Sequence, residues 1–177
     1  MNPKYYKFQS PIGELAVYFT DEGVIGLTFQ EEGDNLKYIK KYYGTPIEVN
    51  KDDYSYHHEI LKYFEGKLKK FTLPISFKGT EFQVKVWKEL LNIPYGETRT
   101  YKEIAEKVGC PKGPRAVGNA LNKNPIAIIV PCHRVVGSNG NLVGFAGLVD
   151  VGLRFAFYSE ENNTEKSMKG ISQVVPY

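Results

Sequence analysis

The chain has 177 residues, of which 42% are hydrophobic and 14% aromatic, and its formal net charge is +3 at pH 7. This composition supports a buried core in one domain or two small ones, and it excludes a disordered chain. The apolar runs are far shorter than the ~20 residues of a membrane span, and the N-terminus has no signal-peptide pattern. We therefore expect a soluble, cytoplasmic protein. The two cysteines, Cys110 and Cys132, are too few for a disulfide framework and their spacing fits no common zinc site.

Residues 1–79 predict an α/β scaffold domain. Residues 13–29, GELAVYFTDEGVIGLTF, alternate apolar and polar side chains around a turn and predict two strands. The lysine-rich stretch 57–71 predicts an amphipathic helix. Its apolar positions at helical spacing are Ile60, Leu61, Phe64 and Leu68. We expect His57 and His58, at the start of this helix, to face solvent.

Three helices are predicted after residue 79. Thr80 can cap the first of them. Thr100 and Glu103 have the spacing of a capping box at the start of the second, which Gly109 ends. Pro114 begins the third. The last two helices and the tight glycine turn between them are typical of a helix-turn-helix.

These elements together predict an α+β fold with two domains. Residues 1–79 form a small N-terminal α/β domain with a short antiparallel sheet. Residues 80–162 form a mainly helical, winged-helix-like domain that contains the helix-turn-helix. Residues 163–177 are polar and without periodicity, so we expect a mobile tail.

Positive charge is concentrated in residues 98–134. This segment carries seven Lys or Arg residues against two Glu residues. Such an excess is expected of a surface that meets phosphate, although a solvated basic face without a partner has the same composition.

The second helix of the predicted helix-turn-helix has small side chains. Ala116, Gly118 and Ala120 favour close approach of the helix backbone to a narrow minor groove, with Arg115 long enough to enter the base stack. Alternatively, the small residues pack against a neighbouring helix.

The stretch NPIAIIVPCHRVVG contains the second cysteine, Cys132. A buried cysteine after an aliphatic strand is usually a small hydrophobe. Here Pro131 interrupts the strand, His133 can act as a base through a water, and Arg134 adds positive charge. Asn124 can tie the loop back. Because adjacent side chains diverge in an extended strand, the cysteine and histidine can cooperate only if the chain bends there.

These motifs resemble the O6-alkylguanine-DNA alkyltransferase family. The resemblance covers nearly the whole chain and is carried by SPIGELAVYF, YGETRTYKEIA, RAVGNAL, NPI followed by PCHRVV, and GFAG. It implies that residues 80–162 are the DNA-binding and alkyl-acceptor domain. It also implies repair of O6-alkylguanine, with O4-alkylthymine as a further expected substrate, by one irreversible transfer to the protein itself after base flipping.

The resemblance also implies catalytic roles. Cys132 is the alkyl acceptor, and its thiolate is formed by a water-bridged His133 that is held by Glu160. Asn124 orders the turn around the cysteine. Tyr101 lies near the target phosphate and donates a proton to the departing guanine.

The expected partner is double-stranded DNA, which the protein contacts through the minor groove. We expect the protein to act as a monomer and not to bind a membrane. Arg115 corresponds to the family's finger, which fills the space left by the flipped nucleotide. The expected DNA contacts are Arg115, Tyr101, Thr100, Ala116, Gly118, Asn119, Lys123 and Arg134. The expected substrate pocket is lined by Val135, Pro131, Phe145, Ala146 and Gly147.

The segment after GFAG departs from the family pattern. Leu148 stands where the family has a glycine. An ungapped count from the cysteine places Ser159 where the glutamate belongs, whereas one extra residue near Gly152 restores Glu160, which we prefer. Residues 1–80 contain no cysteine, so we expect neither the metal of some relatives nor any cofactor.

Two other functions stay open at this point. A non-catalytic sensor of alkylated DNA would share the helix-turn-helix, but family members of that kind lack the reactive cysteine. A thiol hydrolase would use Cys132 and His133 but leaves the basic helix-turn-helix unexplained. Cys110, beside the predicted turn, is expected to be a passive thiol.

Overall fold

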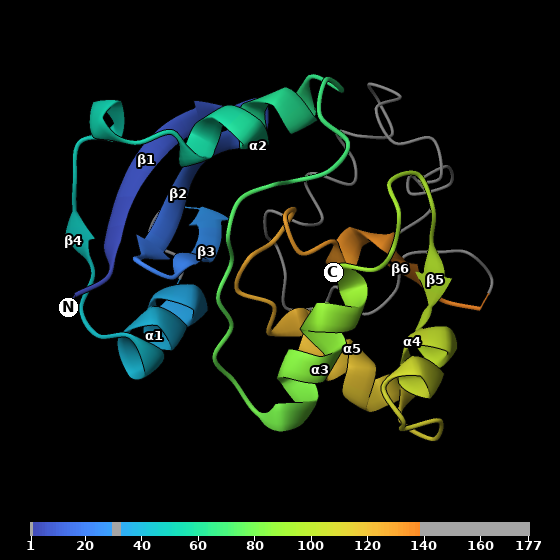
Figure 1. Ribbon diagram of the computed structural model, residues 1–177. Coiled ribbons are helices and arrows are strands. Elements are labelled where there is room, and N and C mark those ends of the chain that lie inside the picture. Colours follow the sequence, from blue (N-terminus) through green and yellow to red (C-terminus); the bar gives the residue numbers. More distant parts are fainter. Residues whose placement is uncertain (1, 30–32, 139–177) are drawn as a thin grey trace. The chain divides into compact units, whose positions relative to one another are not determined.

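The computed structural model describes residues 2–29 and 33–138, and the chain divides into two compact units (Figure 1). The first unit is Met1–Lys78 with Pro125–Ile129, and the second is Gly79–Asn124 with Val130–Tyr177. The short segment Pro125–Ile129 thus returns to the first unit. The domain bounds expected at residues 79 and 162, with their separate roles, stay a prediction.

The first unit contains a four-stranded sheet in the order β3-β2-β1-β4. Its strands are β1 (Lys4–Ser10), β2 (Gly13–Thr20), β3 (Gly23–Phe29) and β4 (Ile47–Glu48). The first three are antiparallel, and β4 pairs with β1 in parallel. The two strands predicted over 13–29 are confirmed as β2 and β3. The sheet is mixed rather than purely antiparallel because of β4.

Helices cover both faces of this sheet (Figure 1). The elements are α1 (Gly33–Tyr42), the short 3-10 turn η1 (Lys51–Asp53) and α2 (Tyr56–Phe64). Ile39 of α1 packs with Ala16, Tyr18 and Ile25 on one face. On the other face the ring of His57 in α2 contacts Tyr6 and Phe8 of β1. Both faces are therefore buried, which explains the apolar run of β2.

The lysine-rich helix is shorter than predicted. It ends at Phe64, and Gly66 adopts a φ of 73°, a left-handed conformation that favours glycine and stops a helix. Leu68, expected on the apolar stripe, lies after this stop and is not helical. The periodicity of the apolar residues continued past the point where the glycine ends the helix.

The second unit is mainly helical. Its elements are α3 (Glu81–Leu90), β5 (Arg99–Thr100), α4 (Tyr101–Lys107), α5 (Pro114–Asn122), η2 (Cys132–Arg134) and β6 (Val135–Val136). The indole Nε1 of Trp87 in α3 donates a buried 2.8 Å hydrogen bond to the carbonyl of Ala120 in α5. This bond ties the first helix of the unit to the second helix of the helix-turn-helix. The fold is α+β, as predicted.

Candidate functional site

A capping box fixes the start of α4. Thr100 Oγ1 accepts a 3.1 Å hydrogen bond from the backbone N–H of Glu103, and Glu103 Oε2 accepts a 2.7 Å bond from the backbone N–H of Thr100. The capping box predicted from the sequence is confirmed. Because the cap defines the first helical residue, it sets the position of Tyr101, which is half-buried.

Helix α5 separates a buried face from an exposed polar one. Pro114 occupies its first turn, where a missing N–H costs nothing. Val117, Ala120 and Leu121 are buried against the unit. The exposed residues, spaced four apart along one side, are Arg115, Asn119 and Lys123. This side contains no acidic residue, since α5 has none.

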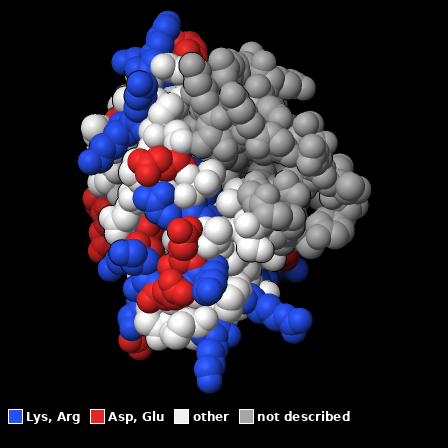
Figure 2. Space-filling model, turned by 90° about the vertical axis from the view of Figure 1, so that its right-hand side faces the viewer, with Lys and Arg blue, Asp and Glu red and all other residues white. Residues whose placement is uncertain are grey.

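The charges on α4 are different. Its exposed residues are Lys102, Glu103, Glu106 and Lys107. The face of the molecule seen in Figure 2 likewise shows Lys and Arg interspersed with Asp and Glu over the described residues. The side of α5 that carries Arg115 and Lys123 is therefore the better candidate for a surface that meets phosphate.

Gly118 of α5 faces Tyr101 of α4 without a tight contact. A Cβ atom at this glycine would be 3.7 Å from Cε1 of Tyr101, which is ordinary van der Waals distance. Gly118 and Ala116 are half-buried, whereas Ala120 is 2% exposed. Of the three small residues, Ala120 thus belongs to helix packing, and the other two keep part of their surface accessible.

The segment before Cys132 is not the continuous strand that was predicted: Ile126 forms an isolated parallel bridge with Leu27 of β3, and the chain then turns tightly. Ile128 has a φ of 71°, and the backbone N–H of Ile129 donates to the carbonyl of Ala127 at 2.9 Å. This is a strained γ-turn, with a β-branched residue in the left-handed region. The side-chain amide of Asn124 donates a buried 3.0 Å bond to the carbonyl of Val130. Asn124 therefore closes the loop, as expected.

Cys132 and His133 lie in the 3-10 turn η2. Cys132 is 1% exposed and His133 is fully buried. The backbone N–H of Cys132 donates to the carbonyl of Val130 at 2.8 Å, so the chain bends immediately before the cysteine. The bend that cooperation of the two side chains requires is present.

A two-residue ladder joins this turn to the helix-turn-helix. Strands β5 and β6 pair in parallel, with Arg99 opposite Val135 and Thr100 opposite Val136. Because Thr100 is the cap of α4, the ladder links the start of that helix to the residues that follow Cys132. The ladder could not be predicted from the sequence because neither strand is longer than two residues.

Arg134, one of the expected DNA contacts, is buried. The residue is 7% exposed, and Nη1 donates a buried 2.7 Å hydrogen bond to the carbonyl of Ile93. The guanidinium carbon is 5.7 Å from the centre of the Tyr95 ring. The guanidinium thus makes contacts inside the second unit, and a contact of Arg134 with DNA stays a prediction.

The expected substrate pocket is described only in part. Pro131 and Val135 flank η2 and are both buried. The remaining residues assigned from the resemblance lie outside the described residues: Phe145, Ala146, Gly147, Leu148, Ser159 and Glu160. The choice between Ser159 and Glu160 as the partner of His133 stays a prediction.

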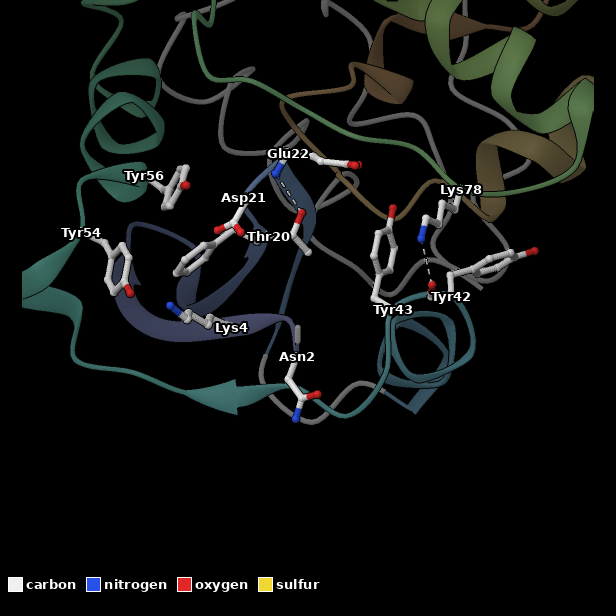
Figure 3. A pocket seen from close by; sticks show the side chains of 11 residues that line it. Asn2, Lys4, Thr20, Asp21, Glu22, Tyr42, Tyr43, Tyr54, Tyr56 and Lys78 are labelled. Carbon is white, nitrogen blue, oxygen red and sulfur yellow. Dashed lines mark hydrogen bonds between the residues drawn. The ribbon is translucent and has the colours of Figure 1, made fainter.

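The first unit contains a tyrosine-rich cavity of about 520 Å³. Figure 3 shows Tyr54 and Tyr56 on one side and Tyr42 and Tyr43 on the other. The Nζ of Lys78 donates to the carbonyl of Tyr42 at 3.2 Å (Figure 3). None of the predicted site residues lines this cavity.

His57 is not the solvent-facing residue that was expected, whereas His58 is exposed. His57 is half-buried, and its backbone N–H donates to the hydroxyl of Tyr6 at 3.1 Å. The same hydroxyl lies 2.9 Å from His57 Nδ1, within hydrogen-bond distance. Burial lowers the pKa of His57 and raises the pKa of Tyr6 to about 12.

Two negative findings apply to the described ranges. None of the helices there combines the length and apolar character that crossing a bilayer requires. In the same residues, no group of three or more His, Cys, Asp or Glu side chains is arranged to hold a metal ion.

Both units match models of known domain families. Residues 4–77 match the ribonuclease-like domain of 6-O-methylguanine DNA methyltransferase, and residues 81–156 match the DNA binding domain of the same protein. Together the two models span most of the chain.

Relatives and solved structures agree with these matches. The chain is 44% identical over 160 residues to the methylated-DNA--protein-cysteine methyltransferase of Methanosarcina barkeri, covering 90% of this chain and 98% of the relative. It is 41% identical over 143 residues to the constitutive enzyme of that name from Bacillus subtilis, covering 81% and 86% of the two chains. The structure is similar to that of Mycobacterium tuberculosis OGT in complex with DNA, with a TM-score of 0.73, 36% identity, and coverage of 93% and 98%.

Proposed function

Because the chain belongs to the 6-O-methylguanine DNA methyltransferase family, we propose that it repairs duplex DNA by moving the alkyl group from guanine O6 onto Sγ of Cys132. The observation that carries this assignment is the buried cysteine in η2, within the unit that also contains the helix-turn-helix. The product is a thioether, which the protein does not reverse. Each molecule therefore acts once.

The burial of Cys132 requires that the target base leave the helix. Guanine O6 lies on the major-groove edge of a stacked pair, and a thiol that is 1% exposed does not reach it there. Extrusion costs a few kcal/mol, and less where alkylation has already weakened the pair. Arg115, exposed at the start of α5, is assigned to the gap that the nucleotide leaves.

The small residues of α5 suit this geometry. Ala116 and Gly118 are half-buried and leave the helix backbone accessible beside Arg115. Asn119 and Lys123 continue the same exposed side and are assigned to the DNA backbone, with Thr100 at the cap of α4. A minor-groove approach needs such short side chains because that groove is narrow.

The chemistry is a single displacement at carbon. His133 takes the thiol proton through a water, and the thiolate attacks the alkyl carbon in line with the bond to O6. The S–C bond forms as the C–O6 bond breaks, and the electron pair stays on guanine. Tyr101 donates a proton to the departing base, and Glu160 holds His133. No metal or cofactor takes part in these steps.

The substrate range and setting are also proposals. Pro131, Val135, Phe145, Ala146 and Gly147 are assigned to the pocket for the flipped base, which we expect to admit O4-alkylthymine as well. We propose that the protein acts as a monomer in the cytoplasm, where Cys132 stays reduced.

Counting turnovers tests the proposed function against its alternatives. The protein is mixed with an excess of O6-benzylguanine, in a DNA duplex and as the free base, and the number of benzyl groups removed from O6 per protein molecule is measured over time. The transferase removes one benzyl group per molecule and then stops. A non-catalytic sensor removes none, and a thiol hydrolase continues beyond one, so either result contradicts the proposal.

A further inference from the structure

The turn that carries Cys132 is held from both sides of the cysteine. Before it, the amide of Asn124 holds the carbonyl of Val130. After it, the backbone N–H of Val135 donates to the carbonyl of Cys132, and β6 pairs with β5. These contacts join the turn to the end of α5 and to the start of α4, and neither of them reaches α3.

The guanidinium of Arg134 supplies a third contact, in a different direction. Nη1 donates a 2.7 Å hydrogen bond to the carbonyl of Ile93, and the bond is buried. A hydrogen bond from a charged donor is shorter and about twice as strong as a neutral one. The guanidinium also lies against the ring of Tyr95, 5.7 Å from its centre. Arg134 thus connects the turn to the loop that follows α3.

The acceptor of this bond is itself rigidly held. The backbone N–H of Ile93 donates to the carbonyl of Leu90, the last residue of α3. At its other end α3 begins with the capping box of Thr80 and Gln83. In between, Trp87 donates to the carbonyl of Ala120 in α5. A group that is hydrogen-bonded to Ile93 is therefore held at a fixed position relative to α3, and through α3 relative to α5, the helix that carries Arg115.

We propose that Arg134 is a positioning residue for alkyl transfer, which holds Cys132 at a fixed place relative to α3 and α5, and that it is not a ligand of DNA phosphate. This inference rests on the proposed function. In-line displacement requires the sulfur to lie close to the alkyl carbon and aligned with the bond that breaks. A misplacement of about 1 Å costs on the order of a hundredfold in rate.

The test measures single-turnover kinetics on two substrates. Arg134→Met keeps the unbranched apolar stem of the side chain and removes the guanidinium, with its donors and its charge. We expect its rate constant for alkyl transfer to fall about tenfold to a hundredfold, equally with free O6-benzylguanine and with O6-benzylguanine in duplex DNA. We expect its Kd for an undamaged duplex to stay unchanged. Arg134→Lys keeps one charged donor and should recover part of the rate.

Two other variants calibrate these measurements. Lys107→Met removes one exposed positive charge from α4, outside the assigned site, and controls for net charge. Lys123→Met removes an expected phosphate contact from α5, and should weaken duplex binding and reduce its salt dependence.

Two results would overturn the inference. If Arg134→Met weakens duplex binding as Lys123→Met does, and reacts normally with the free base, Arg134 is a phosphate ligand. If the fraction of active Arg134→Met or Arg134→Lys protein falls while the rate constant of that fraction stays normal, the residue only stabilises the fold. If the wild-type protein takes up no alkyl group, the proposed function itself is wrong. This result is obtained before any variant is made, so it is distinguished from a failure of the inference about Arg134.

Discussion

Arg115 is the residue on which the proposed flipping step depends. It is exposed in the first turn of α5, and no other exposed side chain of that turn is as long. We expect Arg115→Ala to slow alkyl transfer from duplex DNA by about tenfold or more, because stabilisation of the flipped state by ~1.4 kcal/mol or more is lost. Single-turnover rates on a duplex and on free O6-benzylguanine measure this directly.

The free base controls for damage to the thiol site in this experiment. It needs no extrusion, so its reaction with Arg115→Ala should proceed normally. Lys112→Ala, which removes an exposed cation from the turn before α5, controls for net charge. An Arg115→Ala protein with an unchanged duplex rate would show that the arginine has no part in flipping.

His57 predicts how the stability of the first unit depends on pH. Burial is the main cause that lowers its pKa, with His58 and Lys51 adding to the effect and Asp52 opposing it. The folded state therefore releases this proton more readily than the unfolded state, whose pKa is near the usual 6.5. Stability from the neutral imidazole is fully present above the unfolded pKa and is lost as pH falls through the lower pKa of the folded state.

The measurement is the change in Tm between about pH 7.5 and pH 5.5. His57→Gln should reduce this change, because it removes the group whose protonation favours unfolding. His58→Gln, at the exposed neighbour, should reduce it less. An equal slope in wild type and His57→Gln would rule out His57 as a source of the pH dependence.

At the scale of elements, Gly118 offers a way to distinguish two explanations for the small residues of α5, namely packing against a neighbouring helix and close approach to the minor groove. Replacing an interior helical glycine by alanine stabilises a helix by about 1 kcal/mol, and a Cβ here meets Tyr101 only at 3.7 Å. We therefore expect Gly118→Ala to raise the Tm. If α5 approaches the minor groove closely, the same change should weaken duplex binding.

Ala116→Ser offers a comparison on the same helix, with one polar atom added at a half-buried position. Tm and duplex Kd are measured for both variants. A Gly118→Ala protein that is more stable and binds DNA as wild type would mean that the glycine serves neither close packing nor DNA approach. A lower Tm would instead point to tight packing between α4 and α5.

The helices of the second unit could be predicted because local sequence signals mark where each helix begins. Thr80, Thr100 and Pro114 each satisfy or dispense with backbone groups of the first turn, and all three helices begin where these residues indicate. Helix α1 was not predicted, although Leu36, Ile39 and Tyr43 have helical spacing; Ile39 is its one buried residue among those described. The strand expected before Cys132 failed because nothing in the sequence signals a left-handed Ile128.

The candidate site could be predicted only as far as motifs and local chemistry reach. The closing of the loop by Asn124 and the bend at Cys132 agree with expectation. The bond from Arg134 to Ile93 spans 41 residues, so the sequence showed a positive charge beside Cys132 but neither its burial nor the carbonyl that it binds. Long-range partners of this kind depend on how the helices pack, which local patterns do not encode.

At the scale of the whole molecule, the family assignment extends over both units, from residue 4 to residue 156 apart from a short gap. The first unit supplies a sheet that also holds Pro125–Ile129, through a 3.0 Å bond from the backbone N–H of Leu27 to the carbonyl of Pro125. The stretch that leads to Cys132 thus belongs to the same compact unit as the N-terminal sheet.

The most direct test of the account is intact-protein mass spectrometry after incubation with a duplex that contains one O6-methylguanine. We predict a single mass increase equal to one methyl group replacing one hydrogen, mapped by peptide analysis to Cys132. Cys110→Ser should show the same increase and Cys132→Ser should show none. A wild-type protein that binds the lesion but gains no mass, or that gains it on Cys110, would contradict the assignment of Cys132 as the alkyl acceptor.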